Sequence, residues 1–78
     1  MSNDSDVMKK VMQDIADEGK QNKLSIEGHK AAALVYREHN MEGAAMLLDN
    51  KVAELEKQNE WLKQEWHRIK KELQLLPF

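Results

Sequence analysis

Residues 48–76 read LDNKVAELEKQNEWLKQEWHRIKKELQLL, and this stretch decides the fold that the sequence predicts. Residues suited to a helix seam recur in it at alternating steps of four and three, the spacing of a heptad repeat whose a and d positions face a partner helix. The predicted dimerisation seam consists of Leu48, Val52, Leu55, Asn59, Leu62, Trp66, Ile69, Leu73 and Leu76. We therefore expect a leucine-zipper-type coiled-coil helix over residues 41–78, ending in an apolar tail.

One polar seam residue and the flanking charges set the predicted orientation of the dimer. Asn59 falls at an a position, where its amide can bond the same residue of a second chain only if the two helices run parallel and in register. Lys51 would then face Glu56 of the second chain, which is an attractive pair. The sequence therefore favours a parallel homodimer.

Trp66 fits this dimer poorly. At an a position it would place two indoles in one layer of the seam, which is crowded. A locally distorted homodimer is the simplest interpretation. The alternatives are a trimer, or a heteromeric coiled coil whose other helix carries a smaller residue at that layer.

The first 40 residues predict a small helical head. Apolar residues at three- and four-residue spacing indicate a helix over about residues 6–18, which Gly19 would end. A polar stretch follows, and Ser25 would cap a second helix that runs to about residue 39. The expected fold is all-α, with a two-helix head over residues 1–40 and the coiled-coil helix after it.

Asn40 is expected to separate the head from the long helix. Asparagine suits a left-handed helix end, and a hairpin at this point would cover Ala44, Met46 and Leu47. One long helix that continues through Asn40 is the alternative, because no proline forces a stop there.

Size and composition bound the class of protein. A chain of 78 residues buries little surface and has no cysteine, so we expect oligomerisation to supply stability that disulfides cannot. The longest apolar run, residues 31–36, is far short of the ~20 residues that cross a bilayer. Because the N-terminus is acidic rather than basic, it does not resemble a signal peptide, and we expect a cytoplasmic protein.

Three aromatic residues are the candidates for contact with a protein partner: Tyr36, Trp61 and Phe78. Trp61 lies at a c position off the seam, and tryptophan is enriched among binding hot spots. The alternative is that Trp61 lies flat over the stems of neighbouring lysines or packs on the head. Phe78 ends a tail that could enter a groove of a partner, or simply fold back.

A basic segment offers a second class of function. Lys20, Lys23, Lys30 and Arg37 of two protomers could form a composite patch that binds nucleic acid. The segment lacks the dense basic run of a DNA-binding zipper, so this interpretation is the weaker one. No nucleophile motif, phosphate loop or closely spaced histidine pair occurs, so we expect no enzyme, no metal and no cofactor.

The sequence therefore predicts a small homodimeric regulator that inhibits or scaffolds a cellular protein through protein–protein contacts. The alternatives are a nucleic-acid-binding regulator and a subunit of a heteromeric coiled coil. Small, cysteine-free helical chains of this kind resemble the accessory regulators of bacteria and their phages.

Overall fold

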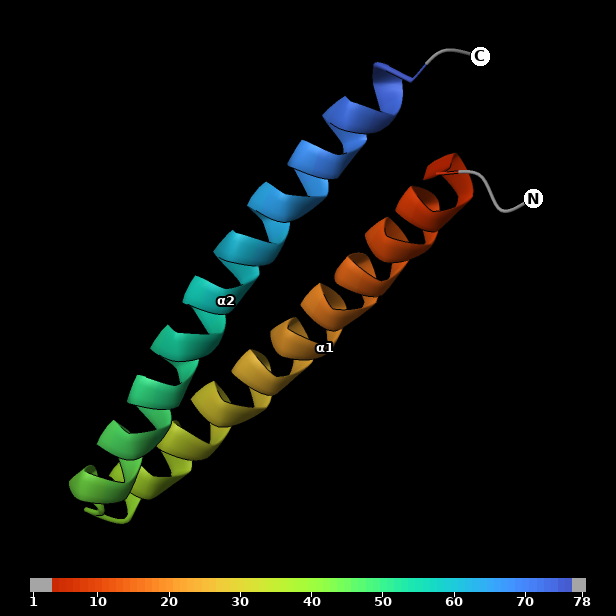
Figure 1. The fold of residues 1–78 in the computed structure, drawn as a ribbon. Helices are drawn as coiled ribbons and strands as arrows, with labels where there is room; N and C mark the ends of the chain where they lie inside the picture. The colour runs from red at the N-terminus through yellow and green to blue at the C-terminus, as the bar shows by residue number, and fades with distance from the viewer. Residues whose placement is uncertain (1–3, 77–78) are drawn as a thin grey trace.

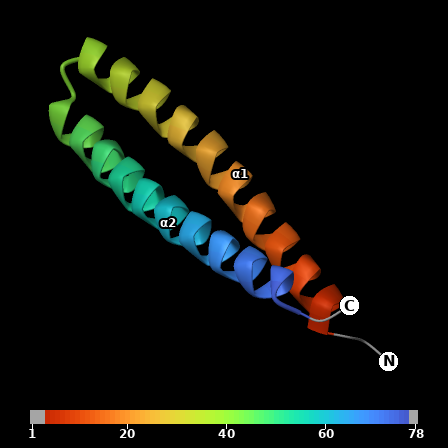
Figure 2. The ribbon, with the colours of Figure 1, turned by 90° about the horizontal axis from the view of Figure 1, so that it is seen from above.

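The computed structural model describes residues 4–76 as two long helices joined by a tight turn. Helix α1 comprises Asp4–Glu38, and helix α2 comprises Glu42–Gln74. The helices run antiparallel and side by side, so that the start of α1 lies near the end of α2 (Figures 1 and 2). The Cα atoms span 60 × 17 × 12 Å. The predicted all-helical class is confirmed for the described residues.

The predicted break between residues 18 and 25 is wrong, because α1 continues through it. Gly19 has a negative φ and so does not act as a left-handed helix end. The following residues, Lys20, Gln21 and Lys23, are good helix formers, and the helix tolerates one glycine at a cost of about 1 kcal/mol. The head is therefore a single helix rather than two.

The predicted break at Asn40 is confirmed, and its geometry explains the hairpin. Asn40 has φ 60°, the left-handed conformation that asparagine adopts more readily than most residues. The Met41 N–H donates to the Tyr36 carbonyl at 2.8 Å, and the Asn40 N–H donates to the Arg37 carbonyl at 3.0 Å. These two bonds form a Schellman motif, which satisfies the last carbonyls of α1 and reverses the chain.

The core lies along the seam predicted on α2, and in this chain the seam faces α1. Val52, Leu62 and Ile69 are buried between the two helices. Near the turn, the small residues Ala33 and Ala45 are also buried, which is typical of a close approach of two helices.

A second heptad pattern, on α1, matches the seam of α2 and was not predicted from the sequence. Residues half-buried or buried on α1 advance by alternating steps of four and three, with Met8 at a d position and Met12 at an a position. The members of the pattern are Met8, Met12, Ile15, Gly19, Asn22, Ile26, His29 and Ala33, and Ser5 extends it by one step toward the N-terminus. Ala16, Ala32 and Arg37, which are also half-buried, flank it at e and g positions. The polar and glycine members concealed the pattern, although the spacing runs through them without interruption.

The hairpin does not cover all the apolar residues expected near the turn. Ala44 is half-buried, but Met46 and Leu47 are exposed, so the expectation is wrong for these two. Met46 and Leu47 follow the buried Ala45. Since each residue of an α-helix is rotated by about 100° from the one before it, these two side chains point away from the seam.

Candidate functional site

A polar layer crosses the middle of the core. Asn22 of α1 donates from its Nδ2 to the Oδ1 of Asn59 at 2.9 Å and to the Oε1 of Gln58 at 3.0 Å. Asn59 in turn donates to the Gly19 carbonyl at 3.3 Å. The amide that was predicted to bond its twin in a second chain thus bonds Asn22 of its own chain. The pair fixes the register of the two helices, because any slip along the seam would leave part-buried amides without partners.

The heptad positions divide the hairpin into two sides. Residues at e positions of the two helices meet on one side, where the Lys30 ammonium lies 3.7 Å from the Glu56 carboxylate and Arg37 bonds Asp49. Glu56 is therefore paired within the chain rather than with the predicted Lys51. Residues at g positions lie on the opposite side, where Gln58 accepts the bond from Asn22.

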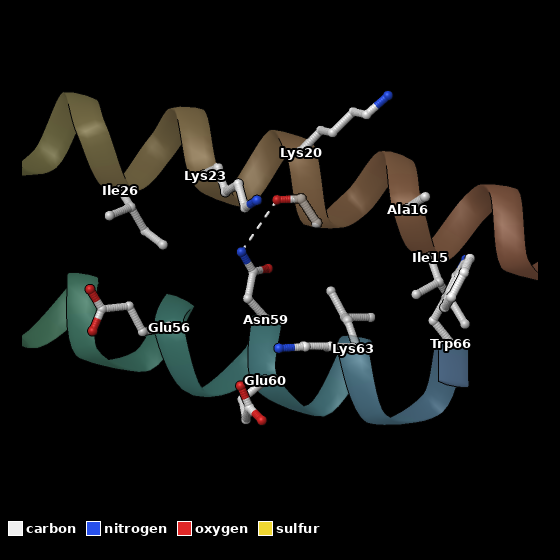
Figure 3. A pocket seen from close by; sticks show the side chains of 12 residues that line it. Ile15, Ala16, Lys20, Lys23, Ile26, Glu56, Asn59, Glu60, Lys63 and Trp66 are labelled. Atoms are coloured by element: carbon white, nitrogen blue, oxygen red, sulfur yellow. Dashed lines mark hydrogen bonds between the residues drawn. The ribbon is translucent and has the colours of Figure 1, made fainter. Parts of the chain in front are cut away.

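An open groove runs along the e side. It has a volume of about 630 Å³ and borders the polar layer (Figure 3). Apolar side chains of Ile15, Ile26 and Leu62 line it, and Gly19 contributes backbone only. Added carbon at Gly19 would meet no other atom within 4 Å, so the space beside this glycine is empty. We call this feature the lysine groove; it is lined by Ile15, Ala16, Gly19, Lys20, Lys23, Ile26, Glu56, Asn59, Glu60, Leu62, Lys63 and Trp66.

The charges on the lysine groove are unevenly neutralised. Within residues 4–76, Lys20, Lys23 and Lys63 make no ion pair with any carboxylate. Glu56 is already engaged by Lys30. The groove therefore offers Lys23 and Lys63 beside an apolar floor, and Lys20 at its outer edge, with its side chain directed away from α2 (Figure 3).

Trp66 closes one end of the lysine groove and also lines a second hollow of about 340 Å³. Ala16 of α1 lines both, and its small side chain leaves room for the indole. The Lys70 ammonium lies 5.0 Å from the centre of the Trp66 ring, within the range of a cation–π contact. The crowding expected of two indoles in one layer is thus absent from the hairpin, because α1 presents Ile15 and Ala16 at this level (Figure 3).

The predicted basic patch is only partly available. Lys20 and Lys23 lie on the lysine groove, but Lys30 is paired with Glu56. Arg37 bonds both Asp49 and Glu42 across the turn. These hydrogen bonds, that to Asp49 first, raise the pKa of the Arg37 guanidinium above its ordinary value, so it stays charged and engaged.

Two of the three aromatic candidates, Tyr36 and Trp61, lie apart from the lysine groove. Tyr36 sits next to the turn and is partly exposed, and its carbonyl belongs to the Schellman motif. Trp61 is 59% exposed. Phe78 lies outside the described residues.

Comparison with protein-family models, curated proteins and solved structures found no match to this chain. Among residues 4–76, neither helix has an apolar stretch long enough to cross a membrane. In the same part of the chain, no three histidine or carboxylate side chains converge as a metal site would require.

Proposed function

We propose that this chain is a regulatory protein-binding module, and that its lysine groove receives an acidic amphipathic segment of a protein partner, which it inhibits or scaffolds. One observation carries the proposal: Lys23 and Lys63, which make no ion pair within residues 4–76, flank an apolar floor, and Lys20 lies at the outer edge of the groove. An amphipathic helix lays its apolar residues into such a groove, and its acidic flanks meet the lysines.

The surroundings of the groove favour a protein segment over nucleic acid. Glu56 and Glu60 line the groove beside Lys63. A nucleic-acid strand carries a phosphate at every nucleotide and would have to pass these carboxylates, whereas a peptide can set apolar side chains beside them and its acidic residues beside the lysines. The other two members of the predicted basic patch, Lys30 and Arg37, are already held by carboxylates. Nucleic-acid binding is therefore the second candidate, and it enters the test below as a competing ligand.

The proposed module is a homodimer of hairpins. A parallel zipper through α2 would use Val52, Leu62 and Ile69, which α1 covers in the hairpin. Such a zipper, or a heteromeric coiled coil, would have to displace α1 and break the bond between Asn22 and Asn59. A dimer that keeps the hairpin intact avoids both costs.

The test uses the full chain with Trp61→Phe, in which Trp66 is the one remaining tryptophan and reports from the groove. The probe is a synthetic amphipathic peptide of ~20 residues, with leucine at i, i+3 and i+7 and glutamate on its flanks. We expect a saturable change in Trp66 fluorescence. Lys23→Glu with Lys63→Glu should weaken binding by about ten-fold or more.

A matched control changes the same charge elsewhere on the chain. Lys57→Glu with Lys71→Glu alters f positions, which point away from both sides of the hairpin, and should leave the affinity within about two-fold. Equal losses in the two double variants would show a non-specific charge effect and contradict the proposal. Tighter binding of a single-stranded oligonucleotide than of the peptide would also contradict it and favour the second candidate.

A further inference from the structure

The side of the hairpin opposite the lysine groove carries several exposed large apolar side chains. Among residues 4–76, eleven large hydrophobic side chains are exposed, and six of them occupy c or g positions on this side. We call this side the Trp61 face, and its apolar members are Val7, Val11, Val35, Leu47, Trp61 and Leu75. Leu47 is 72% and Leu75 is 76% exposed, so the hairpin itself does not cover them. A surface of this kind marks a docking site.

The order of residues along α2 identifies what docks there. The c positions are Leu47, Glu54, Trp61, Arg68 and Leu75. If a second copy of α2 is reversed about Trp61, Glu54 lies opposite Arg68 of that copy. Leu47 likewise lies opposite Leu75. The g positions agree, because a reversal centred half a residue further on, between Trp61 and Leu62, brings Lys51 opposite Glu72 and Gln58 opposite Glu65. Two copies of α2 laid antiparallel about Trp61 would therefore be complementary at every one of these positions.

Helix α1 carries the same reversal on the Trp61 face. Its c positions are Val7, Asp14, Gln21, Gly28 and Val35, which are centred on Gln21. Reversal about Gln21 brings Val7 opposite Val35 of a second copy. The g positions are symmetric about a point half a residue further on, which brings Val11 opposite Ala32, and no pair of like charges meets among these c and g positions.

The two centres of reversal coincide in the hairpin. Asn22 bonds Asn59, so Gln21 lies level with residue 60 of the antiparallel helix, one step from Trp61. A single two-fold axis that passes between Gln21 and Trp61 therefore relates both helices to their copies. Nothing in the seam requires this coincidence, since the seam uses a and d positions only.

We propose that a second copy of this chain docks on the Trp61 face, antiparallel, about a two-fold axis between Gln21 and Trp61, and so forms a four-helix bundle. The inference rests on the homodimer in the proposed function and adds its surface and symmetry. The stripe from Leu47 to Leu75 is roughly 42 Å long, and the hairpin is 17 Å wide. That footprint, roughly 700 Å² on each copy, approaches the ~800 Å² per partner of a standard interface.

Other ways of pairing two copies fit less well. A two-fold axis along the hairpin would set α1 against α2 of the copy, which brings Glu18 opposite Glu65. A parallel zipper would use the seam that α1 covers and leave Trp61 in solvent. Both arrangements are separate outcomes of the test.

Cysteine cross-linking tests the antiparallel dimer directly, because the chain has no cysteine of its own. Trp61→Cys places a thiol beside the axis in each copy, so mild oxidation should give a covalent dimer. Leu47→Cys and Leu75→Cys should each cross-link poorly alone and efficiently when mixed. Ala53→Cys, on an exposed b position away from the Trp61 face, is the control. It should form no disulfide-linked dimer on a non-reducing denaturing gel.

A charge exchange provides a test that introduces no thiol. Glu54→Arg places the new arginine opposite Arg68 of the other copy, and the two-fold axis repeats this repulsive pair. The change should weaken dimerisation by about ten-fold or more in sedimentation equilibrium. Adding Arg68→Glu restores the opposite charges and should restore the dimer. Failure of the second change to restore the dimer would overturn the proposed register.

Three results would overturn the inference. Efficient cross-linking of Leu47→Cys with Val35→Cys would indicate a two-fold axis along the hairpin. Cross-linking through Asn59→Cys would indicate the parallel zipper. The third result is a monomer in sedimentation at every concentration. A monomer whose Trp66 still responds to the acidic peptide would overturn the dimer alone. A dimer that cross-links as expected but ignores the peptide would contradict the groove alone.

Discussion

At the scale of single residues, the pair formed by Asn22 and Asn59 defines the hairpin. Each amide is part-buried, and each has a partner across the seam: Asn22 donates to Asn59, and Asn59 donates to Gly19. A net contribution of about 1 kcal/mol is usual for such a bond, but an amide left without its partner loses more than that. The pair therefore matters more for register than for total stability.

A double-mutant cycle separates these two effects. Asn59→Leu alone should lower the free energy of unfolding by about 1–2 kcal/mol, because Asn22 then loses its part-buried partner and keeps only the exposed bond to Gln58. Asn22→Leu with Asn59→Leu should recover that loss or exceed it, since two leucines replace two amides. Urea unfolding followed by circular dichroism measures both. Simple additivity of the two single changes would show that the amides do not interact.

At the scale of the helices, the sequence predicted α2 and its seam but divided α1 in two. The heptad spacing of α2 is carried by leucine, valine and isoleucine, which report their burial directly. On α1 the same spacing passes through Gly19, Asn22 and His29, residue types that usually mark loops or surfaces. The lysine groove was missed for the same reason, since it forms where Gly19 leaves space opposite Asn59. A heptad pattern shows that a helix packs against another helix, but it does not identify that helix. The turn at Asn40 brings α1 back along α2, so the partner is α1.

The turn between the helices depends on the backbone of Asn40. Its φ of 60° is strained for most residues and free for glycine. Asn40→Ala should therefore lower the free energy of unfolding by about 1 kcal/mol, whereas Asn40→Gly should leave it within about 0.5 kcal/mol. Thermal unfolding of the two variants beside the wild type gives the comparison. Equal behaviour of alanine and glycine would mean that the turn relaxes to a right-handed conformation.

At the scale of the whole molecule, the hairpin has a thin core for its length. In the described part of the chain, five hydrophobic residues are buried, and two of these are alanine. No large side chain in that part is fully enclosed. Two helices can bury only one stripe each, and a chain of this size commonly gains the rest of its stability by association. The Trp61 face supplies the additional apolar surface, and its position opposite the lysine groove leaves the groove open in the dimer.

The stability of the hairpin should accordingly depend on its own concentration. Binding between folded copies stabilises the folded state by mass action, at about 1.4 kcal/mol of dimer for each ten-fold rise in concentration. For a domain of this size, that corresponds to a rise in the unfolding midpoint of about 3–5 °C.

Trp61→Asp places two carboxylates beside the two-fold axis and should abolish the dependence on concentration, so that the variant melts at one temperature throughout. Leu24→Asp is the matched control, because Leu24 is 70% exposed on neither side of the hairpin, and it should keep the slope of the wild type. A wild-type midpoint that stays constant over a roughly hundred-fold range of concentration, measured by differential scanning calorimetry, would show that the thin core is sufficient by itself.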